Sequence, residues 1–332
     1  MTFLKRIIFL VVAILLSFIF LCSYFYFTDT ANGTSWRIKN EKLEANRYTW
    51  TSFTWVNDTL SGRYFKRIAM FIPCKIEGVS ENLQFQFDLG SDKTIIEKDS
   101  WNLISMSNLS VKNQKKRLKN PFLFWNTKEA VENISIKFQS FQASSFKCEI
   151  RSLHSHNLNL LNNFNNPLII GTIGVDMFQN KILIIDYPKE RFAILDSLPD
   201  TFNSNFVPIT FDPYGRVLLP MKIKEKEYKI LLDNGSSVFP LLVSENKISE
   251  FSKLPNIDSF QINSWGIKHT VKGRRLVDSF SIAGKIYYNV VIYYESQRFI
   301  DKTLFDAITG NVLFLDKTLI IDFKGKRFGI IP

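Results

Sequence analysis

Two short motifs of the chain could carry acid–base chemistry. Asp88-Leu89-Gly90-Ser91 follows the apolar run 83–87, and Asp233-Asn234-Gly235-Ser236 follows the run 228–232. A strand that ends in an aspartate and turns on glycine exposes the carboxylate and lets a second loop approach closely. Two carboxylates in one site cannot both ionise easily, so the pair holds a proton between them. Such a pair can activate a bound water while it protonates a carbonyl, which is general acid–base hydrolysis.

An internal repeat relates the two motifs. Residues 183–195 and 319–331 are identical at seven of 13 positions, including a shared Leu-Ile-Ile-Asp start and a later Arg-Phe pair. Gly174 and Gly310 each lie 12 residues before the aspartate of their copy. A Pro-x-Lys-Ile segment also precedes each Asp-x-Gly-Ser motif. A single Asp-x-Gly is ordinary turn chemistry, but two copies at equivalent places in a repeat favour a functional pair.

Short apolar runs bounded by turn residues dominate the chain after residue 60 and predict strands. Helical periodicity is scarce, so we expect a mainly β protein with two homologous lobes at 61–199 and 200–332. Residues 28–60 are polar and aromatic and are expected to form a linker or an initial strand. A pseudo-twofold axis between the lobes would bring Asp88 and Asp233 together. The expected strands include the runs 69–73, 83–87, 134–138, 182–185, 217–223, 228–232, 285–294 and 319–323.

The N-terminal segment is apolar and long enough to cross a bilayer. The run 7–27 has 21 residues and follows Lys5 and Arg6. A helix of about 20 apolar residues spans the hydrocarbon core, whereas a signal peptide has a shorter run and a small-residue cleavage site. We therefore expect an uncleaved transmembrane anchor over residues 1–27. The positive-inside rule puts the N-terminus in the cytoplasm and the rest of the chain outside, and the composition favours a bacterial source.

The chain is basic, with 42 Lys and Arg against 31 Asp and Glu and a formal net charge of +11. Such a balance fits nucleic acid, an anionic surface or simply solvated lysines, and an extracytoplasmic position argues against nucleic acid. Three cysteines and three histidines exclude a disulfide framework and disfavour a multi-ligand metal site. An oxidising compartment permits a disulfide between Cys74 and Cys148, and a buried free pair is the alternative.

With these motifs the chain resembles the retropepsin-like and pepsin-like aspartic peptidases, in a fused two-lobed form that covers residues 65 to 332. The two Asp-x-Gly-Ser motifs match the family's Asp-Thr/Ser-Gly motifs. Its later element, two apolar residues and a glycine, resembles 169–171 or 172–174 in the first lobe and 307–310 in the second. The resemblance implies two β-barrel lobes, a polypeptide substrate, a monomer with an internal pseudo-dimer, and no metal or organic cofactor. It implies catalytic roles for Asp88 and Asp233 and loop-supporting roles for Gly90, Ser91, Asn234, Gly235 and Ser236.

The residues after the two aspartates depart from the family pattern. The family usually has Thr or Ser there, and its hydroxyl joins a hydrogen-bond lattice between the two loops. Leu89 cannot join such a lattice through its side chain, and Asn234 can do so only with a different geometry. Two alternatives follow: an aspartic endopeptidase, or a catalytically inactive protein that binds an extended peptide in the same cleft. A basic module that binds an anionic cell-envelope polymer is a third alternative.

A peptidase of this kind needs a hairpin flap over the cleft. Trp125 and Trp265 lie in the two candidate flaps, and core packing is the alternative role for each. His154 and His156 could bind a metal, but their Asn-rich surroundings favour a solvated loop.

Two further patterns have simpler interpretations. The basic run 112–120 could meet an anionic lipid or polymer, and a solvated loop is the alternative. Asp186 and Asp322 are expected to be hairpin-turn residues paired with Arg191 and Arg327 rather than catalysts.

Overall fold

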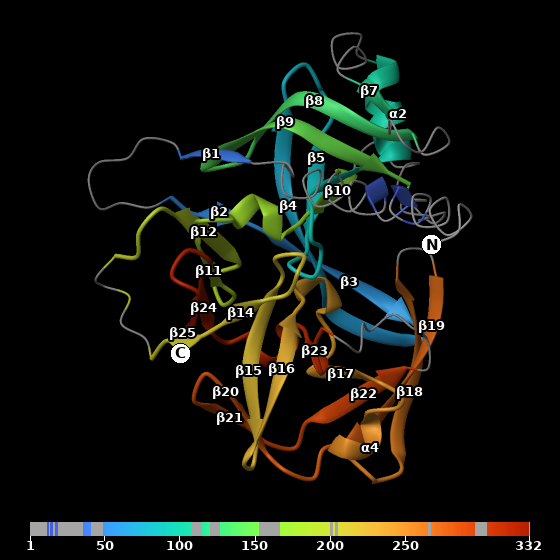
Figure 1. The fold of residues 1–332 in the computed structure, drawn as a ribbon, viewed down its shortest axis with the longest axis vertical. Helices are drawn as coiled ribbons and strands as arrows, with labels where there is room; N and C mark the ends of the chain where they lie inside the picture. The colour runs from blue at the N-terminus through green and yellow to red at the C-terminus, as the bar shows by residue number, and fades with distance from the viewer. Residues whose placement is uncertain are drawn as a thin grey trace, which may run out of the picture.

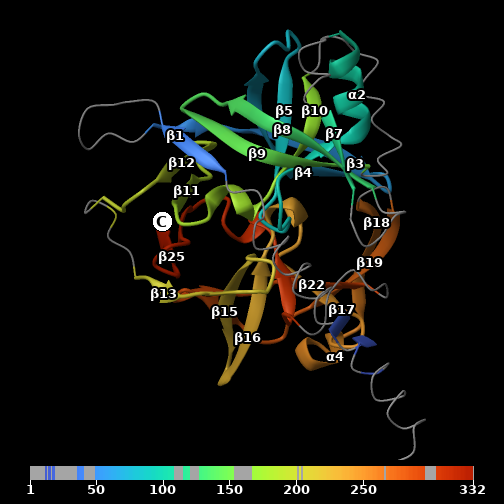
Figure 2. The same cartoon turned by 45° about the horizontal axis from the view of Figure 1, so that its top comes forward.

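The protein is described here by a computed structural model in which strands predominate, as the sequence predicted (Figure 1). The structure describes residues 12, 14–15, 17–18, 36–40, 49–107, 115–119, 127–152, 167–199, 202, 205–264, 267–295 and 304–331. Three sheets make up the described part. Two are large, one from each half of the chain, and a smaller third sheet draws strands from both halves (Figures 1 and 2).

The described residues of the N-terminal half form a nine-stranded sheet in the order β1-β9-β6-β10-β5-β4-β8-β7, with β3 paired to β4. Alternation buries one face of β5, where Leu83, Phe85 and Phe87 point inward between two glutamines. The helix α2 (Lys98–Ser107) follows β6. The strands are β1 (Arg37–Asn40), β3 (Thr54–Leu60), β4 (Arg63–Ile76), β5 (Leu83–Phe87), β6 (Ile95–Glu97), β7 (Lys115–Lys119), β8 (Thr127–Lys137), β9 (Phe141–Arg151) and β10 (Leu168–Ile173).

Ten described strands of the C-terminal half form the second large sheet, in the order β18-β19-β22-β17-β23-β16-β15-β20-β21, with β14 paired to β15. The predicted single strand 285–294 is wrong, because Asn289 has a φ of 54° and divides it into β21 and β22. The short helix α4 (Ile248–Phe251) follows β17. The strands are β14 (Thr210–Phe211), β15 (Val217–Ile223), β16 (Lys226–Leu232), β17 (Leu241–Ser244), β18 (Asn256–Ser264), β19 (Ile267–Arg275), β20 (Phe280–Ile282), β21 (Lys285–Tyr287), β22 (Val291–Glu295) and β23 (Ala307–Thr309).

The two large sheets share a five-strand pattern. The order β9-β6-β10-β5-β4 in one sheet corresponds to β22-β17-β23-β16-β15 in the other. In both, successive neighbours are parallel, antiparallel, parallel and antiparallel. The parallel pairs β5–β10 and β16–β23 therefore end at corresponding edges, and β5 and β16 lead directly into Asp88 and Asp233.

The third sheet joins the halves in the order β13-β25-β24-β11-β12-β2. At its centre β11 runs antiparallel to β24, with Ile184 opposite Ile320, and the flanking pairs Leu183–Ile321 and Ile185–Leu319 are equivalent by the repeat. The register is therefore symmetric about Ile184 and Ile320, as a twofold relation between the copies requires. The strands are β2 (Thr51–Ser52), β11 (Ile182–Asp186), β12 (Arg191–Leu195), β13 (Val207–Pro208), β24 (Thr318–Asp322) and β25 (Arg327–Ile331).

The repeated aspartates of this sheet act as the sequence predicted. Arg191 Nε lies 3.0 Å from Asp186 Oδ2, and Arg327 Nε lies 2.8 Å from Asp322 Oδ2. The other carboxylate oxygen of Asp322 accepts a hydrogen bond from Gly325 N, as that of Asp186 does from the backbone of its own turn. Both pairs therefore stabilise hairpins, and the prediction of turn residues paired with arginine is confirmed.

The hydrophobic core continues from one half into the other. Its largest cluster contains buried residues of all three sheets, and Phe87 contacts Phe178 and Phe192 with ring centroids 5.4 and 5.3 Å apart. Cys74 and Cys148 are buried and free, so the unbonded alternative is the one that the structure has.

The N-terminal predictions are only partly covered by the structure. The described part of residues 28–60 is not a free linker, because β1 pairs with β9, β2 with β12 and β3 with β4. Most of the predicted anchor 7–27 lies outside the described residues. Within the described residues, no helix is both long and apolar enough to span a membrane.

Truncation of Ile184 tests the central seam. Ile184 is fully buried where β11 meets β24, so we expect Ile184→Ala to lower the free energy of unfolding by about 2–5 kcal/mol. Val277 is 67% exposed, and Val277→Ala should change this free energy by less than about 0.5 kcal/mol. Chemical denaturation measures both values. Equal, small losses in the two variants would contradict a structural role for the seam.

Candidate active site

The two aspartates occupy equivalent backbone positions at the ends of parallel strand pairs. Asp88 N donates to Ile173 O over 3.0 Å, and Asp233 N donates to Thr309 O over 2.9 Å. Each aspartate then closes a tight turn, since the N–H three residues later donates to its carbonyl, at 3.2 Å for Asp88 and 3.1 Å for Asp233. After Asp233 the turn continues as the short 3-10 helix η3 (Asn234–Ser236). The repeat therefore delivers each carboxylate by the same local structure.

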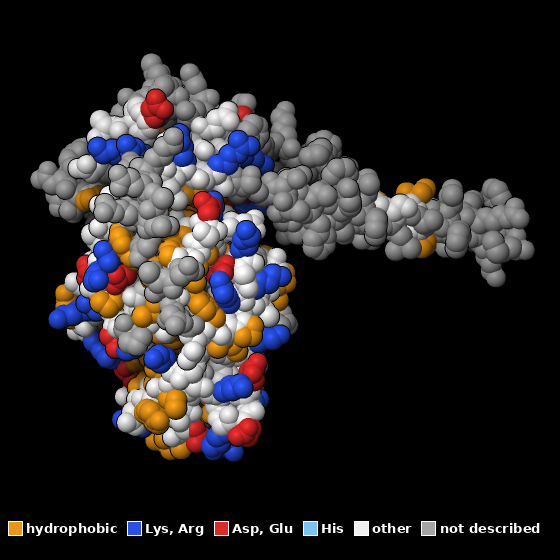
Figure 3. Space-filling model, turned by 90° about the vertical axis from the view of Figure 1, so that its left-hand side faces the viewer, with side chains coloured by type: hydrophobic (Ala, Val, Ile, Leu, Met, Phe, Trp, Pro, Cys, Tyr) orange, Lys and Arg blue, Asp and Glu red, His pale blue; other side chains and the backbone are white. Residues whose placement is uncertain are grey.

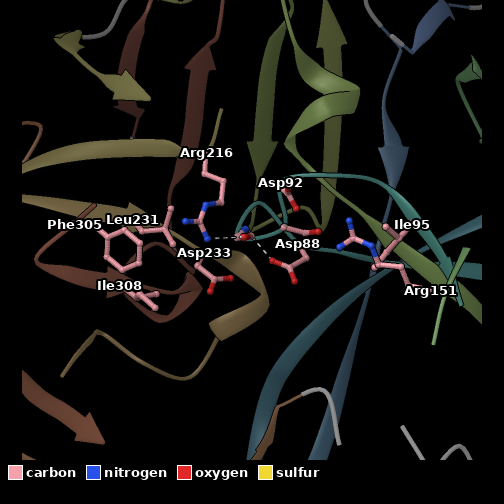
Figure 4. Close-up of a pocket in the computed structure, with 11 residues that line it drawn as sticks. Asp88, Asp92, Ile95, Arg151, Arg216, Leu231, Asp233, Phe305 and Ile308 are labelled. Carbon is pink, nitrogen blue, oxygen red and sulfur yellow. Dashed lines mark hydrogen bonds between the residues drawn. The ribbon is translucent and has the colours of Figure 1, made fainter. Parts of the chain in front are cut away.

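The two loops face each other at very short range, and glycine makes this approach possible. A Cβ atom on Gly90 would lie 2.5 Å from Asp233 Oδ1, and a Cβ atom on Gly235 would lie 2.6 Å from Cγ of Asp88. Both distances are too short for any side chain. Each glycine therefore packs against the carboxylate of the opposite half, and Asp88 and Asp233 lie side by side (Figure 4).

The serines of the motifs act differently in the two halves. Ser236 donates twice to Asp233, from N to Oδ1 over 3.1 Å and from Oγ to Oδ2 over 2.9 Å. Asp88 instead accepts from Gly90 N over 2.8 Å, and Ser91 Oγ turns away to Lys93 O. Ser91 supports the loop through its backbone, since its carbonyl accepts from Val175 N in the 3-10 helix η2 (Val175–Phe178). The hydroxyl support of the carboxylates is thus confined to Asp233.

The positions that depart from the family pattern also meet between the loops. Leu89 is fully buried, and its N–H donates to Oδ1 of the buried Asn234. One side-chain contact therefore joins the residues that follow the two aspartates. Leu89 itself packs in the hydrophobic core.

Burial and proximity perturb the aspartate pair. Asp88 and Asp233 are only 7% and 8% exposed. Burial raises the pKa of Asp88 well above its usual range, and the Asp233 charge and a side-chain hydrogen bond with Asp233 raise this pKa further. The backbone N–H groups of Gly90 and Ser91 lower it by a smaller amount. The pair is therefore built to retain a proton at pH values where isolated aspartates are ionised.

A cavity of about 300 Å³ opens over the two carboxylates (Figure 4). The C-terminal half lines it with three apolar side chains, Leu231, Phe305 and Ile308, and with Arg216. The N-terminal half lines it with Asp92 and Arg151 and with one apolar side chain, Ile95. The equivalent positions in the repeat therefore do not give equivalent walls. The remaining lining residues are Gly90 and Ser91.

Arg216 is a lining residue that sequence reasoning missed. Its Nε and Nη2 atoms both lie 2.7 Å from Oδ2 of the buried Asp212, which fixes the guanidinium. Nη1 donates to Gly90 O over 3.4 Å, from the C-terminal half to the Asp88 loop, and the guanidinium lies 5.6 Å from the centre of the Phe305 ring. The spacing Asp-x-x-x-Arg could have suggested the ion pair, but not its place beside Gly90.

Several predicted features lie outside the part that the structure describes. These are both flap tryptophans, Trp125 and Trp265, and the histidines His154 and His156.

The described residues settle two further points about charge. Within the basic run 112–120, residues 115–119 form the strand β7. Among the described residues, no group of three or more His, Cys, Asp and Glu side chains could hold a metal ion. On the face in Figure 3, Lys and Arg side chains are dispersed among acidic ones rather than gathered in one patch.

No protein-family model matches the chain, and no curated protein matches it. The repeat and the geometry of the two loops therefore carry the functional assignment.

The raised pKa of Asp88 predicts a dependence of stability on pH. A carboxyl whose pKa is higher in the folded state stabilises the fold below its unfolded pKa of about 3.9, and this contribution is lost as the pH rises through the folded pKa. The free energy of unfolding of the wild type, relative to Asp88→Asn, should therefore fall from acid to neutral pH. Denaturation at several pH values measures it, with Asp196→Asn, whose side chain is 74% exposed, as the control. A constant difference between wild type and Asp88→Asn would contradict the assignment.

The close approach of the loops predicts a strong effect of Gly90→Ala. The added methyl group would force the loops apart, so the pKa of Asp88 should move toward its ordinary value and folding should weaken by about 1–3 kcal/mol. Carbon-13 NMR titration of the aspartate carboxyls follows the first effect. In the control Gly284→Ala nothing lies within 4 Å of the added methyl, and only the left-handed φ of 75° adds strain, so the Asp88 titration should not move. An identical titration in both variants would show that the loops do not touch.

Proposed function

We propose that the protein is an aspartic-type endopeptidase that hydrolyses peptide bonds with a water held between Asp88 and Asp233. The observation that carries this proposal is the reciprocal packing of Gly90 on Asp233 and Gly235 on Asp88. It brings two buried carboxylates into one cavity, and the raised pKa of Asp88 suits a pair that shares a proton.

The chemistry follows from the protonation of the pair. Asp233 acts as the base, because Ser236 N and Oγ both donate to its carboxylate, and Asp88 carries the shared proton. As water attacks the peptide carbonyl, Asp233 takes a proton from the water and Asp88 gives its proton to the carbonyl oxygen. The resulting tetrahedral intermediate breaks its C–N bond when the amine nitrogen receives the proton from Asp233. The other hydroxyl proton returns to Asp88, and the original protonation state is restored.

The proposed architecture is two retropepsin-like lobes related by a pseudo-twofold axis. The shared five-strand order of the two large sheets supports this, and so does the symmetric pairing of β11 with β24. The walls of the cavity give the substrate a direction. Leu231, Phe305 and Ile308 suit an apolar side chain on one side of the scissile bond, and Asp92 and Arg151 suit a polar one on the other.

The proposal includes the location of the enzyme. Residues 7–27 anchor the chain in a membrane with the N-terminus inside, and the catalytic halves act on polypeptides outside the cytoplasm. The length of the apolar run and its flanking Lys5 and Arg6 support this orientation.

Leu89 favours a second candidate, a peptide-binding protein without catalysis. Its buried apolar side chain stands where the family that the chain resembles has a hydroxyl. The two candidates share the cavity and differ in what the carboxylates do. Peptide binding that persists in the double variant Asp88→Asn/Asp233→Asn, with no cleavage by the wild type from acid to neutral pH, would favour binding alone.

Cleavage of a peptide pool by the full-length chain tests the proposed activity. Asp88→Asn and Asp233→Asn should each reduce cleavage by a factor of at least about 10²–10⁴. In either variant the remaining aspartate faces an amide, and the two side chains cannot share a proton. Wild-type activity should fall as the pH rises through the raised pKa of Asp88. Asp196→Asn, which changes an exposed aspartate, should cleave as the wild type does. Cleavage that survives in both active-site variants would refute the proposed mechanism. Mass spectrometry identifies the products.

A further inference from the structure

Buried polar side chains form a chain across the boundary between the two halves. Tyr187 Oη donates to Asn311 Oδ1 over 2.5 Å, and Asn311 Nδ2 donates to Asn234 O over 2.8 Å and to Ser237 Oγ over 2.5 Å. Asn234 Oδ1 in turn accepts from Leu89 N. Tyr187 and Leu89 belong to the N-terminal half and the others to the C-terminal half, and none is more than 2% exposed. The polar chain therefore crosses the boundary twice.

The orientation of each group in this chain is determined by its partners. Asn311 is the residue that begins the 3-10 helix η4 (Asn311–Leu313). Turning its amide over would set its oxygen against Asn234 O, so that two acceptors would face each other. Turning the Asn234 amide would set two donors against each other at Leu89 N. Burial raises the pKa of Tyr187, so its hydroxyl remains a donor over the working pH range. A fully satisfied buried network of this kind is rigid.

The polar chain exists on only one of two equivalent sides. Tyr187 follows Asp186 as Phe323 follows Asp322, and the equivalence holds in space, since Tyr187 N donates to Lys317 O and Phe323 N to Lys181 O. By the same repeat, the equivalent of Asn311 is Val175 and the equivalent of Asn234 is Leu89. Three polar residues on one side therefore correspond to three apolar residues on the other. The departure at Leu89 is one part of a coordinated difference between the halves.

We infer that Tyr187, Asn311 and Asn234 are positioning residues that hold the Asp233 loop in register with the Asp88 loop. Asn234 directly follows Asp233 and Leu89 directly follows Asp88, so the contact between them joins the two loop tips. Asn311 fixes the backbone of Asn234, and Tyr187 fixes Asn311 from the opposite half. This inference rests on the proposed function, because it concerns the geometry that hydrolysis needs.

Two buried tyrosine hydroxyls allow a matched test. Tyr187→Phe removes the first donor of the polar chain and should lower kcat about tenfold with KM within about twofold, because small displacements of the reacting groups are costly. The pH profile of kcat should also shift, because the carboxylates move relative to each other. Tyr287→Phe is the control, since no described residue hydrogen-bonds to Tyr287 Oη, and both quantities should stay at wild-type values. Full-length variants are compared on one peptide that the wild type cleaves.

A double variant separates positioning from mere stability. Tyr187→Phe/Asn311→Val introduces the residue types of the equivalent positions Phe323 and Val175. Asn234 O keeps its hydrogen bond from Ser237 Oγ. In the double variant neither residue 187 nor residue 311 has a polar side-chain atom left without a partner. Its melting temperature should therefore be higher than that of Tyr187→Phe, while kcat should stay low. It also serves if Tyr187→Phe alone does not fold. Recovery of wild-type kcat and pH profile together with stability would overturn the inference.

Carboxyl titration by carbon-13 NMR distinguishes failure of this inference from failure of the proposed function. If the wild type cleaves no peptide, the proposed function fails, but the Asp88 titration still reports the register of the two loops. A titration that moves in Tyr187→Phe and in the double variant, and not in Tyr287→Phe, supports the positioning role. A titration identical in all four proteins overturns it.

Discussion

The mutual burial of two carboxylates is the constraint on which the rest of the structure depends. An isolated ionised carboxylate is expensive to bury, and two of them side by side are more so. Asp88 and Asp233 meet this constraint by facing each other across two glycines and by retaining a proton, which the raised pKa of Asp88 expresses. The arrangement tolerates very little displacement. A methyl group on either glycine would occupy the space of the opposite carboxylate.

The two large sheets bring the loops to this position because both contain the same arrangement of strands before the aspartate. In each half two parallel strands end at the same edge of the sheet. The N–H of the aspartate that follows one strand donates to the last carbonyl of the other. The seam between β11 and β24 then sets one half against the other with a register symmetric about Ile184 and Ile320. Both faces of this seam are buried, with Leu183 and Ile185 in the main core cluster and Ile184 in a separate cluster. A one-residue slip would exchange these two sets of side chains between the faces.

Local sequence patterns predicted the parts of the structure that depend on local physics. The sequence predicted the strand 83–87, the turns at Asp186 and Asp322 with their arginines, and the equivalence of the two Asp-x-Gly-Ser loops. The break at Asn289 could not be predicted, because asparagine adopts both ordinary and left-handed φ and only the fold decides between them. Arg216 was missed for a different reason. Its contact with Gly90 spans 126 residues, and no local pattern encodes a partner at that distance.

The differences between the halves matter for the proposed hydrolysis as much as the likeness does. In an exact twofold arrangement the two carboxylates would be equivalent, and only the position of the shared proton would distinguish the acid from the base. Here Ser236 Oγ donates to Asp233, whereas Ser91 Oγ turns to Lys93 O. The polar side chains of Tyr187, Asn311 and Asn234 also have apolar counterparts on the other side. The cavity walls differ as well, with three apolar side chains from the half that carries Asp233 and one from the half that carries Asp88. The repeat thus supplies two carboxylates at one place, and the divergence of the halves makes their surroundings unequal.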